Sequence, residues 1–137
     1  MEPARQRLRF DDLTRESGTD GRCRVTVKLE WCGRTMEGSV EGLETQHGRV
    51  RASAEACMAA ATAAAGKRVH LELIGVKAVR AFDGWVVVTR LIADDGSGTT
   101  RLLGASSTED ESGVERAACL AVLDATNRIL ERHVARE

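Results

Sequence analysis

The chain has 137 residues and a formal net charge of −1, with two phenylalanines, two tryptophans and no tyrosine. This length fits one domain. The balanced charge and the scarcity of aromatic rings argue against a nucleic-acid-binding protein, which needs a basic face or rings on which bases stack. The beginning of the sequence lacks the apolar core of a signal peptide, and no apolar run approaches the ~20 residues of a membrane-spanning helix. We therefore expect a cytoplasmic protein without a membrane partner.

The first third of the chain contains one charged segment and one hairpin. Residues 1–20 interleave arginines with carboxylates and show no periodic apolar pattern, which predicts a flexible N-terminal arm ahead of a single domain at 21–137. Residues 22–31 alternate between apolar and polar side chains, as a strand with one wet face does. A shorter alternation follows over 35–41, and Gly33 eases the turn between the two.

The middle of the chain predicts a helix followed by an irregular strand. Apolar residues recur at helical spacing over 49–65, and Gly66 is a typical helix stop. Residues 67–80 alternate as a strand, but the phase of the alternation changes near Gly75. An extra residue at that point, forming a β-bulge, would explain the change.

Two more strands and a long closing helix complete the predicted elements. Residues 85–93 are apolar on both faces, which is typical of a covered strand, and 99–106 form the next strand. Thr108 and Glu111 match the capping box of a helix that continues to His133. One face of this helix carries a stripe of mostly small residues at Val114, Ala118, Ala121, Val122, Ala125 and Ile129.

The predicted order is ββαβββα, which indicates the α+β class, with an antiparallel sheet and two helices packed on one face. The second apolar face of 85–93 and the second apolar side of the closing helix remain uncovered in this arrangement. Such surfaces usually lie in interfaces, and a symmetric homodimer is the commonest way to bury them. The interface residues we expect are Trp85, Val87, Leu120 and Leu123.

The sequence contains no recognisable catalytic or metal-binding motif. Its three histidines lie far apart in the sequence, and none belongs to a metalloprotease, serine-hydrolase or phosphate-loop pattern. The four cysteines include no C-x-x-C pair, so we interpret them as small, reduced core residues. We therefore expect a protein that is not an enzyme, with no catalytic residue, metal or cofactor.

One segment is a candidate ligand site because it precedes the closing helix. Backbone N–H groups at a helix N-terminus can bind a carboxylate or phosphate, and neighbouring hydroxyls add further donors. The alternative is that these residues only cap the helix, and three acidic residues at 109–111 would repel an anion. The expected ligand-binding residues are Gly104, Ala105, Ser106, Ser107 and Thr108.

A family resemblance lies in the same part of the chain. Gly104, Ser106 and Asp110 follow the last strand, and the helix continues into the AVLDATNR segment at 121–128. These pieces resemble the C-terminal regulatory (allosteric) domain of 2-isopropylmalate synthase and the related citramalate synthases. The resemblance implies a similar order of elements over 22–133, a dimer, and a branched-chain amino acid or similar effector bound between subunits. The chain departs from the family because it lacks the G-x-G-P-V stretch and the catalytic barrel.

Two classes of function follow from these observations. The first is a stand-alone dimeric regulatory or small-molecule-binding module, non-catalytic, whose ligand is a small anionic metabolite or amino acid. The alternative is an assembly or scaffold protein that binds other chains through its sheet and helix faces. A third interpretation takes 49–132 as the α-β-β-β-α order of a double-stranded-RNA-binding domain. That module needs lysines where this chain has acids at 109–111, so we expect no nucleic-acid partner.

Overall fold

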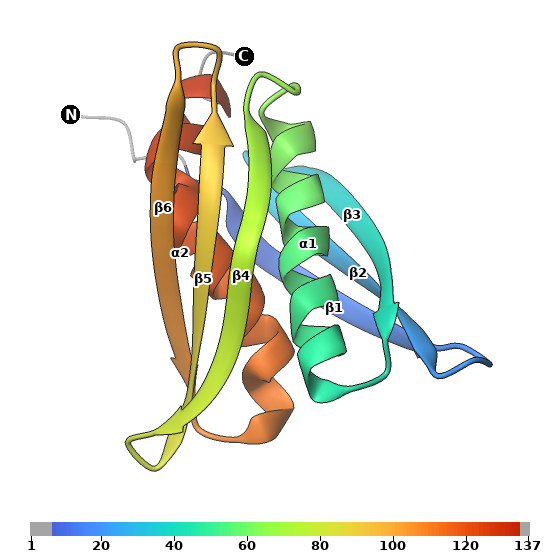
Figure 1. The fold of residues 1–137 in the computed structure, drawn as a ribbon. Coiled ribbons are helices and arrows are strands. Elements are labelled where there is room, and N and C mark those ends of the chain that lie inside the picture. The colour runs from blue at the N-terminus through green and yellow to red at the C-terminus, as the bar shows by residue number, and fades with distance from the viewer. Residues whose placement is uncertain (1–6, 135–137) are drawn as a thin grey trace.

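The computed structural model describes residues 7–134, which form two successive βββα units (Figure 1). The elements of the first unit are β1 (Arg9–Ser17), β2 (Arg22–Trp31), β3 (Arg34–Leu43) and α1 (Gln46–Ala64). The second unit comprises β4 (His70–Ala81), β5 (Gly84–Asp94), β6 (Thr99–Thr108), a 3-10 turn at Glu111–Gly113 and α2 (Val114–Val134). The α+β class expected from the sequence is therefore confirmed.

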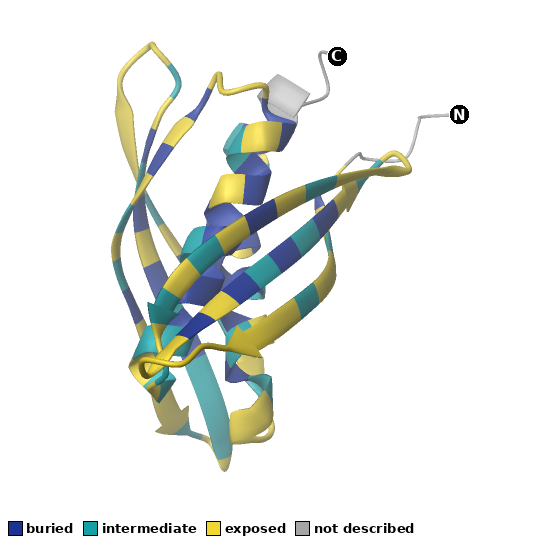
Figure 2. Cartoon of the chain, turned by 90° about the vertical axis from the view of Figure 1, so that its right-hand side faces the viewer, coloured by how far each residue is buried: buried dark blue, intermediate teal, exposed yellow. Residues whose placement is uncertain are grey.

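The molecule is a three-layer sandwich in which both helices lie between two sheets. Strands pair in the orders β1-β2-β3 and β4-β5-β6, and every pairing is antiparallel. Helix α1 packs on β2 and β3 and also meets β4, whereas α2 packs on β5 and β6 and also meets β1. The two helices contact each other in the middle layer (Figures 1 and 2). The sequence predicted a single sheet with both helices on one face. The structure has two sheets instead, so each helix is covered on two sides.

The two halves repeat the same register. Val27 of the central strand β2 pairs with Gly38, and Thr89 of the central strand β5 pairs with Gly104 in the same way. A methyl group added to Gly38 would collide with the carbonyl oxygen of Ala56 on α1, and one added to Gly104 would collide with that of Ala121 on α2. Each glycine therefore lets a helix backbone lie directly on its sheet.

The first strand of each sheet also carries a bulge at the same place. The register of β1 shifts between Phe10 and Asp12, and that of β4 shifts between Leu73 and Gly75. The predicted irregularity near Gly75 is thus confirmed. The matching bulge in β1 was not expected, because the charged residues of this segment hide its alternation.

Residues 9–17 form a strand where the sequence predicted part of a flexible arm, so that prediction is wrong for this stretch. Leu8 is 4% exposed, and Phe10 and Leu13 pack against the core. The part of the predicted arm at 1–6 lies outside the described residues. No helix in the described part of the chain is long and apolar enough to cross a membrane.

Candidate functional site

The predicted ligand segment at 104–108 is strand, not loop. All five residues belong to β6 and pair with 85–89 of β5. Gly104 is buried against α2, and the backbone N–H of Ala105 donates to the Asp124 carboxylate at 3.1 Å. The convergence of free N–H groups on which that site depended is therefore not present.

The start of the closing helix also differs from the prediction. Helix α2 begins at Val114, after a 3-10 turn whose N-cap is Asp110, and the Asp110 side chain makes no capping hydrogen bond. The expected capping box of Thr108 and Glu111 does not form. Glu111 instead accepts a hydrogen bond of 2.8 Å from the side chain of Gln46, which links the starts of the two helices.

Two of the four predicted interface residues lie in the core. Val87 is 0% exposed and Leu123 is 4% exposed within a single chain, so neither can form a dimer interface without unfolding. Trp85 and Leu120 are half-buried. The prediction for Val87 failed because its face of β5 is covered by α2, and that for Leu123 failed because the middle layer covers both sides of the helix.

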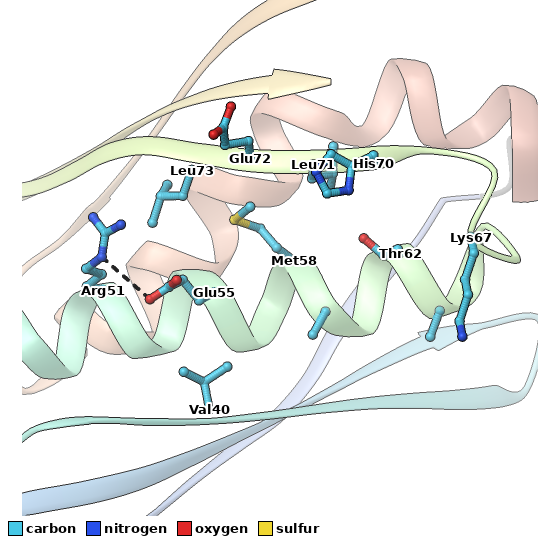
Figure 3. A pocket seen from close by; sticks show the side chains of 12 residues that line it. Val40, Arg51, Glu55, Met58, Thr62, Lys67, His70, Leu71, Glu72 and Leu73 are labelled. Carbon is cyan, nitrogen blue, oxygen red and sulfur yellow. Dashed lines mark ion pairs between the residues drawn. The ribbon is translucent and has the colours of Figure 1, made fainter. Parts of the chain in front are cut away.

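An open groove of about 740 Å³ runs along the exposed side of α1 (Figure 3). Strand β3 borders it on one side and β4 on the other, and both are edge strands of their sheets. Small residues of α1 form the floor at Ala59 and Ala63. The groove is therefore a channel between two sheet edges rather than a closed cavity.

The walls of the groove are apolar near its middle. Met58 reaches from α1 toward β4, where Leu71 and Leu73 lie, and Val40 points from β3 toward the other side of α1 (Figure 3). Met58 and Leu71 are buried, and the other two are half-buried. Such a surface can accept a branched aliphatic group of a few carbon atoms.

Charged groups stand at both ends of this apolar stretch. Arg51 and Glu55, one helical turn apart on α1, form an ion pair with 3.6 Å between Nε and Oε1. Their side chains are 43% and 40% exposed, so both remain accessible to a ligand. Lys67 and His70 lie at the opposite end, where α1 gives way to β4 (Figure 3).

The corresponding side of α2 is occupied by the protein's own side chains. Asp124 accepts the Ala105 N–H on the edge of β6, and Ala59 is the equivalent residue on α1. The guanidinium of Arg116 lies 5.4 Å from the centre of the Phe10 ring on β1. Where α2 carries Asp124, α1 carries Ala59. The short alanine side chain does not cover the edge of β3, which helps to leave the groove open.

Two buried thiols lie where the helices cross. The Cys57 Sγ donates to the Cys119 carbonyl at 3.6 Å, and the Cys119 Sγ donates to the Ser53 carbonyl at 3.5 Å. The hydrogen bond with Cys119, followed by burial, raises the pKa of Cys57 well above its ordinary value. Because only a thiolate is an effective nucleophile, Cys57 is a core residue rather than a reactive group.

The sequence matches no known protein family and no curated protein. Among residues 7–134, no group of three or more histidine, cysteine or acidic side chains is placed to hold a metal ion.

The groove over α1 was not predicted from the sequence. The sequence did contain an indication of it, a row of residues spaced four apart at Arg51, Glu55, Ala59 and Ala63. This row forms the exposed side of an otherwise buried helix.

Proposed function

We propose that the chain is a stand-alone, non-catalytic regulatory or small-molecule-binding module. In this proposal it acts in the cytoplasm and binds a zwitterionic amino acid with a branched apolar side chain in the groove over α1. The observation that carries the proposal is the accessible Arg51–Glu55 pair beside an apolar wall. The resemblance to the 2-isopropylmalate synthase regulatory domain supports the same class of ligand.

The pair matches the head group of an amino acid. A guanidinium binds a carboxylate, and a carboxylate binds an ammonium group, so Arg51 and Glu55 would each exchange their mutual contact for one with the ligand. The exchange replaces an exposed ion pair, which contributes only about 0–1 kcal/mol. The aliphatic side chain would then lie against Met58 and Leu73, removing apolar surface from water.

Thermal melting and calorimetric titration of the full chain with leucine and isoleucine test this proposal. Binding to the folded state alone should raise the unfolding free energy by about 2.7 kcal/mol at a hundredfold excess over the dissociation constant. The 2-keto acid of leucine has no ammonium group, so it should bind more weakly. A wild-type melt that neither amino acid shifts would refute the proposal.

The matched variants are Glu55→Gln and Glu41→Gln. Glu55→Gln removes the carboxylate that would bind the ammonium group of leucine. The affinity for leucine should fall by about tenfold or more, since a hydrogen bond to a charged group contributes about 1.5–3 kcal/mol. Affinity for the keto acid should change less. Glu41 belongs to a similarly exposed pair with Arg24 on the outer face of the first sheet and does not line the groove, so its variant should bind leucine normally. Equal effects of the two variants would contradict the proposed pose.

A second candidate function is assembly with other protein chains. The outer face of the β4-β5-β6 sheet favours it, because large apolar side chains are exposed there, including Leu103 at 62% and Ile74 at 51%. A small-molecule site does not account for this surface, which lies on the side of the sheet away from the helices.

A further inference from the structure

The outer faces of the two sheets differ in chemistry although their backbones repeat the same register. The outer face of β4-β5-β6 carries six large apolar side chains between its charged residues, at Ile74, Val79, Val86, Val88, Ile92 and Leu103. The equivalent positions of β1-β2-β3, in the same order, hold Asp11, Glu16, Arg24, Thr26, Glu30 and Glu37. The first sheet therefore serves as an internal reference for the second.

The comparison separates what the fold requires from what it does not. The polar face of the first sheet is solvated and folds into the same three-stranded arrangement, so apolar side chains are not needed at these positions to form the strands. Exposed apolar surface that the fold does not need usually marks an interaction site. We therefore expect the outer face of β4-β5-β6 to be an interaction surface.

We propose that this partner is a second copy of the chain, stacked face to face on the same sheet. One pair of charges on the face is self-complementary about an axis along β5. Glu72 on β4, Ile92 on β5 and Arg101 on β6 form one cross-strand row, with the two charges on opposite sides of the centre. A two-fold axis along β5 places β4 over the second copy's β6, so Glu72 meets the second copy's Arg101, and the reverse pair forms at the same time.

Both charged groups are free to form these pairs. Glu72 and Arg101 are exposed, and neither has an ion-pair partner among residues 7–134. Aligned sheet packing keeps the strand directions within about 30°, which a tilt of the axis away from β5 accommodates. Apolar side chains of the neighbouring rows, such as Val88 and Leu103, fill the layer between the sheets.

Two residues oppose the association. Arg90 lies on β5 two positions before Ile92 and Asp94 two positions after it, both close to the axis, so each faces the same residue of the second copy. These like-charge contacts lower the affinity without changing the geometry. Removing the charge in Arg90→Leu should therefore tighten the dimer.

The dimer does not depend on ligand binding in the groove. The groove runs along the edge of β4 beside α1, whereas the stacked face points away from both helices. Glu72 borders both, but Leu103 does not line the groove. Ligand binding and dimerisation are therefore separable, and each can fail without the other.

Sedimentation equilibrium of the full chain at micromolar concentration tests the interface. We expect about twice 14.8 kDa for the wild type. Leu103→Arg should raise the dissociation constant by about tenfold or more, because it buries a further cation beside Arg90, its cross-strand neighbour. A charged side chain at this register is compatible with the strand, since Glu37 occupies the equivalent position in β3. The control is Leu43→Arg, at a similarly exposed leucine on β3, which should remain dimeric.

A charge exchange tests the orientation of the two copies. Glu72→Arg should weaken the dimer, and the double variant Glu72→Arg with Arg101→Glu should restore it. A monomeric wild type, or equal behaviour of the Leu103 and Leu43 variants, would overturn the proposal. Failure of the double variant to recover would reject the axis along β5. Leucine titration of the monomeric Leu103→Arg variant then tests the groove independently of the dimer.

Discussion

Gly38 on β3 and Gly104 on β6 hold the same position in the two halves, each directly under a helix. An added Cβ on Gly38 would lie 2.8 Å from the Ala60 nitrogen, and one on Gly104 would lie 2.7 Å from the Ala125 nitrogen. In both cases the obstacle is helix backbone, which cannot rotate aside as a side chain does. The thickness of the three-layer sandwich is therefore set by two glycines and by the alanines that face them.

Replacing either glycine with alanine should destabilise the fold. The helix must move away from its sheet, and overpacking of this kind costs about 1–3 kcal/mol. Urea denaturation followed by circular dichroism should show a lower midpoint for both Gly38→Ala and Gly104→Ala. The control is Gly75→Ala, because a Cβ at Gly75 meets no atom within 4 Å. A Gly104→Ala variant as stable as the control would mean that α2 does not rest on β6.

Glu115 joins three elements from both halves. Its Oε1 accepts hydrogen bonds of 2.9 Å from Arg15 on β1 and from Arg49 on α1, and its side chain is 14% exposed. Glu115→Gln should lower the unfolding free energy by about 1–3 kcal/mol, because it removes charge-assisted bonds in a mostly desolvated place. Chemical denaturation measures the loss.

The matched change is Glu41→Gln, which weakens the ion pairs of Glu41 with Arg22 and Arg24. That carboxylate is 53% exposed, so the effect should stay within about 0.5 kcal/mol. A loss at Glu115 no larger than this would show that the bridge contributes nothing to holding β1 on the helices.

Cys57 should make stability fall in alkaline solution. Its pKa is raised in the folded state, first by the hydrogen bond with Cys119 and then by burial. Above about pH 8.5 the unfolded thiol loses its proton while the folded thiol keeps it, so the unfolding free energy decreases as pH rises. The slope from this group reaches at most about 1.4 kcal/mol per pH unit.

Urea denaturation at several pH values between 8 and 10 measures this slope. Cys57→Ala should make the slope shallower, whatever its effect on stability at pH 7. Cys32→Ser changes an exposed thiol, so it should leave the slope as it is in the wild type. An unchanged slope in Cys57→Ala would assign the alkaline loss to other groups.

Local patterns predicted the elements whose two faces differ in polarity. The alternation over 22–31 matches β2, and the phase change at Gly75 marks a real bulge. The first helix was placed within a few residues, at 46–64 rather than 49–65. Its start was missed because the cap is a single contact, in which the Thr45 hydroxyl accepts from the Gly48 N–H.

The remaining features depend on contacts between distant residues. Strand β1 was missed because a bulge interrupts its alternation, and the partners of Phe10 and Leu13 come from later in the chain. Gly104 was interpreted as part of a loop, whereas it is needed for the close approach of Ala121 and Ala125. The groove was missed because it arises only when α1 lies between the edges of two separate sheets.

The pairing of strands only within each half also bears on how the chain folds. Each sheet is made from three consecutive strands joined by short turns, so its contacts close small loops and lose little chain entropy. The contacts between the halves, chiefly those of α1 with α2, span much longer stretches of chain. We expect the two sheets to form early and independently, and the interface between α1 and α2 to form in the last step.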